Sequence, residues 1–324
     1  MEAGLLAFVG RRLAGAVPLM AVIVVLTFLL IHAAPGDPAT LLAGDAASPK
    51  LIEQVRNEYH LNQPLVDQLG IYLLNMIHGN MGISIYYDLP VNQVILQRAP
   101  NTLLLIGVSL ILAVCLGAIA AVLSVANRDT IVDSLISGIS ISGYAIPSFW
   151  LAQMLVIVFA VGLHWFPTGG MTTIGQSLPG FAHIEDVLGH LILPAVTLAV
   201  FEMGLVARFM RAGLLDALDK EFVTVAYAKG LDKWAVIIRH AIPNSVLPVA
   251  SVVGQQFGVL VAGAVVIETV FSWPGIGQLF YGAIFNRDYP LLMGCFIYAT
   301  VGVVLANLAT DAIYAAIDPR VYRS

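Results

Sequence analysis

The stretch Glu221–Pro248, EFVTVAYAKGLDKWAVIIRHAIPNSVLP, is charged and amphipathic and contains no long apolar run. Apolar segments of about the length needed to cross a membrane lie on both sides of it, at approximately 191–207 and 246–267. A polar hairpin between two such segments offers a soluble partner a place to bind. The stretch therefore indicates a membrane protein to which a soluble partner binds on one side of the membrane.

Composition also places the chain in a membrane. Of its 324 residues, 59% are hydrophobic and 11% are charged, whereas a soluble domain carries about 25% charged residues. An all-α structure is expected, because lipid offers no partner for an unpaired backbone group and the apolar segments lack the alternation of barrel strands. Cys115 and Cys295 fall within apolar runs and are predicted to be buried and unpaired.

Six apolar stretches reach roughly the 20 residues that a helix needs to span a bilayer. They cover approximately residues 13–34, 102–126, 134–163, 191–207, 246–267 and 290–310. The third is too long for one straight helix, and Pro147 is expected to kink it. The first exceeds the apolar core of a signal peptide, which is about 7–15 residues long, so we expect it to be retained. The sequence predicts one transmembrane domain over residues 1–324.

Basic residues are distributed unevenly between the two sides of this arrangement. With both termini inside, eleven lie on the inner side and four on the outer, the latter being Lys50, Arg56, Arg98 and Arg287. Because inner loops carry the excess of Lys and Arg, the bias predicts cytoplasmic termini and a cytoplasmic hairpin over residues 211–245.

The segment 35–101 is then a large extracytoplasmic loop. Ser48 and Pro49 are typical of a helix start, and a second helix is predicted from about Asn62 to Gly79. A third short segment, residues 91–99, leads into the second span. The loop is expected to act either as a lid over a pathway or as a packing cap. The histidines of the next external loop, 162–190, lack the spacing of a metal motif, so they are predicted to be solvated.

Two helices are predicted within the polar hairpin. The first ends near Lys229, because Gly230 can adopt the left-handed conformation that closes a helix. Asp232 is a typical N-cap for the second, and Pro243 is expected to end it. The second helix is expected to join the fifth span rigidly.

The exposed side chains of the first hairpin helix have the sizes that a docking contact needs. Val225, Ala226 and Ala228 are small enough to enter a groove, and Tyr227 and Lys229 can make contacts at its rim. The chain contains no G-x-x-x-x-G-K-[ST] segment and no Gly-Lys dipeptide. Energy from a nucleotide would have to come through another subunit.

A series of short motifs is shared with one family. In order they are Arg11-Arg12-Leu13, Pro35-Gly36-Asp37-Pro38, Gly79–Ser84, Arg98–Leu103, Ala228-Lys229-Gly230-Leu231, Arg239-His240-Ala241, Glu268–Gly277, Arg287–Pro290 and Asp318-Pro319-Arg320. Through these motifs, over nearly its whole length, the chain resembles the B-type permease of the oligopeptide and dipeptide importers of the ABC superfamily.

The resemblance implies the fold of a type I ABC importer permease in a bacterial inner (plasma) membrane, and inward peptide transport by alternating access. It implies as partners a C-type permease, two ATPase subunits that bind ATP and Mg²⁺, an extracytoplasmic peptide-binding protein and the lipid bilayer, but no nucleic acid. No cofactor, metal or catalytic residue is expected in the chain itself. The residues expected to couple it to the ATPases are Glu221, Thr224, Val225, Ala226, Tyr227, Ala228, Lys229, Gly230, Leu231, Asp232 and Arg239.

One position departs from the general importer pattern. The common loop begins Glu-Ala-Ala, whereas this chain has Thr224-Val225-Ala226 at the aligned positions. The peptide branch of the family commonly departs there, so the difference favours that branch. It leaves no acidic side chain at the first position for a salt bridge to the ATPase.

Polar residues in and beside the apolar stretches are candidates for the pathway and its outer gate. An ionisable residue in a membrane needs a partner or water, so Glu202 is expected to meet a peptide ammonium group or to face inner-leaflet water. The pathway candidates are Tyr144, Gln153, Glu202, Gln255 and Gln256, whose alternative role is to hold helices together. The outer gate or turn is expected to contain Asp37, Glu268, Trp273, Pro274, Arg287 and Asp288, with Trp273 at the membrane interface and Arg287 as a partner for Glu268.

Three other functions remain open at this stage. A closely similar permease could import nickel or another small solute. A secondary transporter driven by an ion gradient would instead show inverted repeats and broken helices, which are not evident here. A membrane scaffold or receptor would leave the hairpin with a binding role only. Co-purification of an ATPase distinguishes the importer from the secondary transporter.

Overall fold

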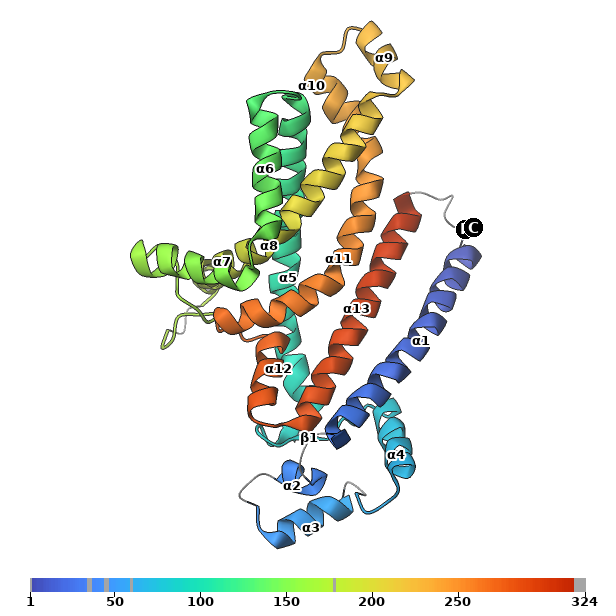
Figure 1. Cartoon of the computed structure of the whole chain (residues 1–324), viewed down its shortest axis with the longest axis vertical. Helices are drawn as coiled ribbons and strands as arrows, with labels where there is room; N and C mark the ends of the chain where they lie inside the picture. The colour runs from blue at the N-terminus through green and yellow to red at the C-terminus, as the bar shows by residue number, and fades with distance from the viewer. Residues whose placement is uncertain (1, 34–36, 44–46, 59–60, 177–178, 318–324) are drawn as a thin grey trace. The chain divides into compact units, whose positions relative to one another are not determined.

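The computed structural model describes residues 2–33, 37–43, 47–58, 61–176 and 179–317, and within several helices it leaves individual side chains undescribed. The motifs at Pro35-Gly36 and Asp318-Pro319-Arg320 lie outside the described residues. The chain forms two compact units, and Figure 1 labels the helices and strands that they contain. Unit 1 comprises Met1–Thr102 and Pro274–Leu305, and unit 2 comprises Leu103–Trp273 and Ala306–Ser324.

Unit 1 contains the first helix, the short elements of the predicted outer loop and part of the C-terminal region. Its elements are α1 (Glu2–Ala33), α2 (Pro38–Ala43), α3 (Pro49–Glu58), α4 (Leu65–Ile77), β1 (Ile83–Ser84), β2 (Leu89–Pro90), α12 (Ile276–Phe285), the start of α5 (Val91–Ala126) and most of α13 (Tyr289–Ile317). The strands pair antiparallel, with Ser84 opposite Leu89. The core of this unit is apolar and includes Val91, Ile95, Leu279, Leu291 and Cys295.

The predicted helix start at Ser48 is confirmed, because the Leu51 backbone N–H donates to the Ser48 hydroxyl at 3.3 Å and α3 begins at Pro49. The next helix begins at Leu65 rather than near Asn62, since Pro64 takes the N-cap position with an extended backbone. The buried side chain of Gln68 donates to the Gln63 carbonyl at 2.8 Å and so holds the turn before the helix.

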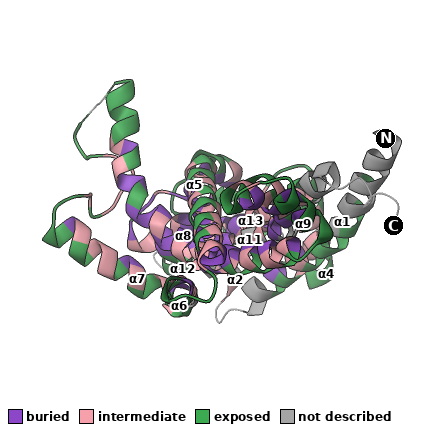
Figure 2. Cartoon of the chain, turned by 90° about the horizontal axis from the view of Figure 1, so that it is seen from above, coloured by how far each residue is buried: buried purple, intermediate pink, exposed green. Residues whose placement is uncertain are grey.

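Unit 2 is a bundle arranged around one long helix. Its elements are the rest of α5, α6 (Ile131–Ala145), α7 (Ser148–Leu155), η1 (Val156–Gly162), α8 (Phe181–Leu218), α9 (Glu221–Ala228), α10 (Lys233–Val236), η2 (Ile237–Ala241), α11 (Ile242–Val270) and the end of α13. α8 packs against α6, α7 and α11. Figure 2 accordingly shows much of α8 buried or half-buried, while α6 and α7 expose large parts of their surfaces.

The predicted break in the third apolar stretch is confirmed. α6 ends at Ala145, Pro147 has an extended backbone, and α7 starts at Ser148 and runs across the direction of α6 (Figure 1). Pro147 disfavours a helical conformation at the residue before it, which explains why the helix stops there.

Three sequence-based boundaries are wrong. The expected loop up to His190 is helical from Phe181, and His190 is buried, with its Nδ1 2.8 Å from the Asp186 carbonyl. The short segment 91–99 is continuous with the second span in α5, which accommodates Pro100. Pro243 does not end the hairpin helix, because α11 begins at Ile242 directly after η2 and contains Pro243 in its first turn.

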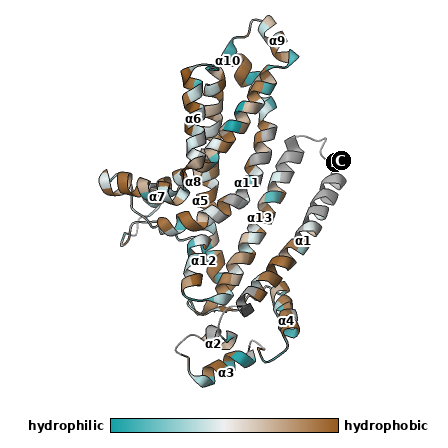
Figure 3. Cartoon of the chain, viewed as in Figure 1, coloured by the Kyte–Doolittle hydropathy of each residue, from teal (hydrophilic) through white to brown (hydrophobic). Residues whose placement is uncertain are grey.

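Within the described residues, three helices are both long and apolar enough to cross a membrane, namely Val91–Ala126, Phe181–Leu218 and Tyr289–Thr310. Figure 3 shows the corresponding apolar colouring of α5, α8 and α13, and hydrophilic residues in the segment that carries α9 and α10. Of the cysteines, Cys295 is buried as expected, but Cys115 is exposed on α5.

The prediction that Trp273 anchors at a membrane interface is wrong. Its side chain is 0% exposed and belongs to the core of unit 2, together with Leu191, Ile267 and Phe271. The turn after α11 folds inward, because the Gly170 N–H donates to the Phe271 carbonyl at 2.8 Å. An added Cβ on Gly169 would lie only 2.5 Å from that carbonyl oxygen, so this turn needs a glycine opposite it.

A close approach of α6 to α8 depends on Gly204. A Cβ at this position would lie 2.2 Å from the Ser140 carbonyl oxygen, which is backbone and cannot move aside. We expect Gly204→Ala to separate the two helices and to destabilise the protein by about 1–3 kcal/mol. Thermal unfolding of the detergent-purified chain measures this.

The matched control is Gly138→Ala in α6, where a Cβ meets nothing within 4 Å. It should leave the unfolding temperature unchanged or raise it, because Ala is favoured over Gly inside a helix by up to about 1 kcal/mol. Equal losses in the two variants would show that the close contact at Gly204 is not the cause.

Candidate functional site

The polar hairpin closes its first helix with a complete Schellman motif. Gly230 has a φ of +83°, its N–H donates to the Tyr227 carbonyl at 2.9 Å, and the Leu231 N–H donates to the Ala226 carbonyl at 3.3 Å. These are the two bonds that define the motif. The predicted roles of Gly230 and Asp232 are confirmed, since the Asp232 carboxylate accepts from the Trp234 N–H at 3.2 Å and caps α10.

The hairpin has a small apolar core of its own. Val223, Ala226 and Val236 are buried in it, and Leu218 and Leu231 pack against them. Ala226 is only 3% exposed, so the expectation that its side chain enters a groove on a partner is wrong. The helical period explains this, because Val223 and Ala226 are three residues apart and lie on the same face of α9.

The opposite face of the hairpin is open to solvent. Val225 is 53% exposed and Tyr227 47%, and Trp234 and Ile238 are also exposed. The other predicted coupling residues Glu221, Thr224, Ala228, Lys229, Gly230, Asp232 and Arg239 are exposed too, and Leu231 is half-buried. An apolar and aromatic surface with lysine and arginine beside it suits a protein partner.

The hairpin continues into α11 without a break. α10, η2 and α11 follow one another directly from Lys233 to Val270, and the residues that flank η2 have right-handed helical dihedrals. Ile237 and Ala241 are buried, the latter in an apolar cluster with Val125 of α5, Met210 of α8 and Val249 of α11. A force on α10 would therefore be transmitted to the bundle.

A second connection runs to the turn between α5 and α6. The Lys233 ammonium group donates to the Ala126 carbonyl, and Ala126 is the last residue of α5. Carbonyls at a helix C-terminus lack intrahelical partners and carry partial negative charge, so a lysine is a fitting donor. The first residue of α10 is thereby attached to the end of α5.

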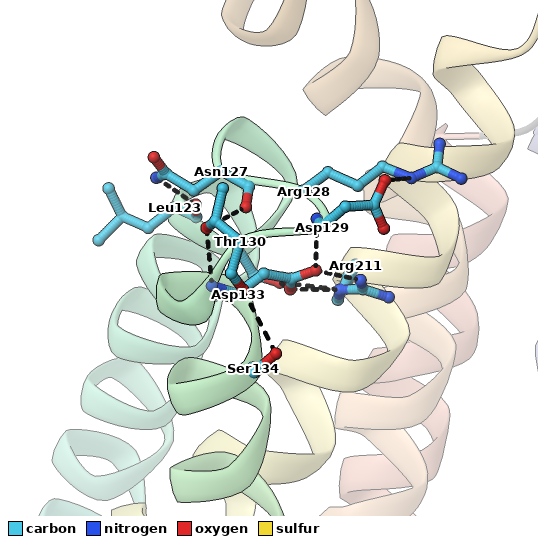
Figure 4. Close-up of polar contacts among 9 residues, drawn as sticks. Leu123, Asn127, Arg128, Asp129, Thr130, Asp133, Ser134 and Arg211 are labelled. Carbon is cyan, nitrogen blue, oxygen red and sulfur yellow. Dashed lines mark hydrogen bonds and ion pairs between the residues drawn. The ribbon is translucent and has the colours of Figure 1, made fainter.

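The same turn is held from α8 by an ion pair (Figure 4). The Arg211 guanidinium donates to the Asp133 carboxylate through Nη2 at 2.8 Å and Nε at 3.2 Å. The Ser124 hydroxyl of α5 also donates to this carboxylate and accepts from Arg211 Nε at 2.8 Å. One carboxylate thus connects α5, α6 and α8.

Asp133 lies in the first turn of α6, before the apolar stretch that begins at Ser134. Thr130 caps this helix by accepting from the Asp133 N–H at 3.4 Å. The hydrogen bonds from Arg211 and Ser124 lower the pKa of Asp133 to about 2, so the carboxylate is ionised at neutral pH. From the sequence, Arg211 is one of the eleven basic residues on the inner side, and nothing there predicts its pairing with Asp133, which lies 78 positions away.

Two pathway candidates meet in the structure. Glu202 of α8 is 2% exposed, and the Gln256 amide of α11 donates to its two carboxylate oxygens at 3.1 and 3.3 Å. Glu202 therefore does not face water in this arrangement. Gln153 is exposed on α7, and the side chains of Tyr144 and Gln255 lie outside the described part of the structure.

The outer-turn candidates fall into separate groups. In unit 1, Asp288 is fully buried and accepts from the Ser84 hydroxyl, the Tyr86 N–H and the Leu291 N–H. It thereby caps α13 and fixes the β1–β2 hairpin.

The other outer-turn candidates have separate contacts. Asp37 pairs with Arg56 at 2.7 Å and connects α2 to α3. The Pro274 carbonyl accepts from Asn101 at 2.8 Å. Glu268 is fully buried in unit 2, and Arg287 belongs to unit 1, so their pairing stays a prediction.

Comparison with known proteins establishes the family. The family described as "Binding-protein-dependent transport system inner membrane component" matches residues 113–323, and the corresponding N-terminal family matches residues 5–106. The chain belongs to this family of transport-system permeases. The resemblance drawn from the motifs is thereby confirmed.

Curated relatives match over almost their full length. The chain is 39% identical over 316 residues to the oligopeptide transport system permease protein AppB of Bacillus subtilis (strain 168), covering 97% of this chain and 99% of AppB. It is 38% identical over 315 residues to a putative peptide transport system permease of Brucella abortus (strain 2308), covering 97% and 98%. It is 36% identical over 317 residues to the glutathione transport system permease GsiC of Escherichia coli (strain K12), covering 98% and 99%.

The fold is that of a type I ABC importer permease. A structure of the MetNI methionine ABC transporter in an inward-facing conformation matches with a TM-score of 0.53 and 16% identity, covering 70% of this chain and 97% of that chain. A second crystal form of the same transporter gives a TM-score of 0.54.

Because the Asp133–Arg211 pair is partly buried and connects three helices, removing one partner should leave the other without compensation. We expect Asp133→Asn to cost about 1.5–3 kcal/mol and Arg211→Gln a similar amount. The double variant should cost clearly less than the sum of the two. Thermal unfolding of the three variants measures this coupling.

The pH dependence of the wild-type chain has a defined sign. Since the pKa of Asp133 is lowered from 3.8 to about 2 in the folded protein, its contribution to stability is complete above about pH 4 and is lost as the pH falls toward 2. The control is Asp129→Asn, which removes an exposed ion pair to Arg128 with a separation of 3.6 Å and should change stability little. If the losses of stability in Asp133→Asn and Arg211→Gln were additive in the double variant, the coupling between the two side chains would be contradicted.

Proposed function

We propose that this chain is the transmembrane permease subunit of an ATP-driven importer that moves peptides into the cytoplasm. The family assignment and the type I importer fold support the transporter class. The relatives named above are peptide, oligopeptide and glutathione permeases, and they support a peptide substrate. Glutathione is itself a tripeptide, so all three agree on the chemical class. ATP hydrolysis belongs to partner subunits, not to this chain.

The proposed arrangement has six membrane spans, cytoplasmic termini and an extracytoplasmic loop over residues 35–101. The three described helices that are long and apolar enough to span, together with the distribution of Lys and Arg, support it. We place the chain in a bacterial inner membrane beside a C-type permease. Two ATPases that bind ATP and Mg²⁺ would contact it from the cytoplasm, and a peptide-binding protein from the other side.

The observation that carries the proposal is the form of the hairpin. It has its own core, the end of α9 and the start of α10 are capped, and yet it exposes Val225, Tyr227 and Trp234. Such an element does not need a partner to fold, but its apolar outer face offers a partner a binding surface. We assign this face to the ATPase contact.

Transport would then follow from movement of the hairpin. ATP binding brings the two ATPases together and displaces α9 and α10. The displacement reaches α11 through the continuous helix and α5 through the Lys233–Ala126 contact. A switch of this kind needs two discrete arrangements whose balance a ligand shifts.

The pathway proposed for the peptide passes close to α8 and α11. Glu202 and Gln256 form the one described contact between pathway candidates. In the arrangement described here the carboxylate is closed off, so we propose that it becomes accessible to a peptide ammonium group when α8 and α11 separate. The outer gate is assigned to Asp37, Glu268, Trp273, Pro274, Arg287 and Asp288.

The conformation of Gly230 provides a direct test of the hairpin. Its φ of +83° is strained for a β-branched residue although a Cβ there meets nothing within 4 Å. We therefore expect Gly230→Val to lower ATP-driven uptake at least tenfold while the chain still inserts in the membrane. The control is Gly230→Asn, since Asn tolerates the left-handed conformation, and it should retain most of the uptake. Unchanged uptake in Gly230→Val would remove the hairpin from the coupling route.

The substrate is tested by uptake in cells that lack this chain. Labelled tripeptides to pentapeptides, a dipeptide, glutathione and Ni²⁺ are offered in parallel, with the wild-type chain or Gly230→Val restored. Loss of peptide uptake that only the wild type rescues is the expected result. Loss of Ni²⁺ uptake with peptides unaffected would keep the importer class and overturn the substrate.

A further inference from the structure

A groove lies on unit 2 between α5, α6 and α8, at the same end as the Asp133–Arg211 pair. Its volume is about 340 Å³, within the range of about 300–1,000 Å³ that small-molecule sites occupy. Small side chains make up much of its wall, among them Ala120 and Ala121 of α5 and Gly204, Ala207 and Ala212 of α8. Neither the peptide pathway nor the ATPase contact proposed above uses it.

The polar part of the groove is basic. Arg208 and Arg211 line it together with Ser124 and Ser137, and the two arginines lie three residues apart on one face of α8. Among the described residues, Asp133 is the carboxylate bonded to Arg211, and none forms an ion pair with Arg208. The Arg208 side chain is exposed, and its guanidinium lies 5.6 Å from the centre of the Phe209 ring. One positive charge at the groove thus remains uncompensated.

This combination has the chemistry of a phospholipid site. A planar guanidinium can donate two parallel hydrogen bonds to a phosphate, and basic pockets between membrane helices bind anionic head groups. The apolar remainder of the groove can receive an acyl chain against Ile136, Leu205 and Leu215. A soluble anion would use the arginine but would leave this apolar wall uncovered.

The groove also lies on a different face of α8 from Glu202. Gly204, Arg208, Arg211 and Leu215 follow one another at helical spacing along the wall of the groove, whereas the Glu202 side chain meets Gln256 of α11. The groove is bounded by α5 and α6 rather than by α11. These positions favour a lipid over a peptide in transit.

We propose that this groove binds one anionic phospholipid, with the phosphate on Arg208 and an acyl chain along the α5–α6–α8 surface. The bound lipid compensates the charge that the protein leaves unpaired and fills the space beside the Ser140–Gly204 approach of α6 and α8. This inference needs only that the chain is a membrane permease, and it does not depend on peptide being the substrate.

Native mass spectrometry of the full chain, in the complex with which it co-purifies, tests the site by titration with phosphatidylglycerol and phosphatidylcholine. The wild type should retain one phosphatidylglycerol in preference to phosphatidylcholine. Arg208→Gln should weaken this binding step about five- to tenfold, the size expected for one basic contact, and Arg208→Lys should weaken it less. Ala212→Leu keeps the charge but narrows the groove, and it should also weaken the step.

The matched control is Lys220→Gln, which removes an exposed cation of unit 2 that pairs with Asp216 and is not part of the groove. It should leave the preference unchanged. Equal binding in wild type and Arg208→Gln, or equal losses in Arg208→Gln and Lys220→Gln, would overturn the proposal. So would displacement of the lipid by soluble glycerol phosphate or by a peptide with a free carboxylate, since either would assign the groove to a soluble ligand.

Discussion

The ion pair between Asp133 and Arg211 is the constraint on which the hairpin end of unit 2 depends. A carboxylate among helix ends is costly unless its charge is compensated, and Arg211 and Ser124 provide that compensation from α8 and α5. Because Asp133 lies in the first turn of α6, the same bonds fix where α6 begins. The ends of α5, α6 and α8 are therefore held together here before any partner binds.

The hairpin is attached to that fixed end rather than folded into it. Its Schellman motif, its Asp232 cap and its small core make α9 and α10 a self-contained element. It is connected to the bundle by α8, whose last residue Leu218 packs against the hairpin core, by the continuous helix into α11 and by the Lys233–Ala126 hydrogen bond. A rigid element with few connections can transmit a displacement without losing its own structure, which is the requirement for coupling to an ATPase.

The buried carboxylates Glu202 and Asp288 also have hydrogen-bond partners within the protein. Glu202 has the Gln256 amide, and Asp288 in unit 1 has a hydroxyl and two backbone N–H groups. Where a positive charge remains unpaired beside a groove, at Arg208, the bilayer itself can supply the partner. The gate and pathway residues chosen from the sequence are thus largely structural contacts in this arrangement, and transport would have to open some of them.

The membrane class, the break at Pro147, the closing of α9 at Gly230 and the cap at Asp232 could all be predicted from the amino-acid sequence, because each depends on composition or on chemistry within a few residues. The motifs of the sequence were also sufficient for the family. The burial of Trp273 and Ala226, the start of α8 at Phe181 and the contacts of Asp133 with Arg211 and of Lys233 with Ala126 became evident only in the folded chain. Those features depend on contacts between residues far apart in the chain, and neither hydropathy nor helical period specifies which helix packs against which.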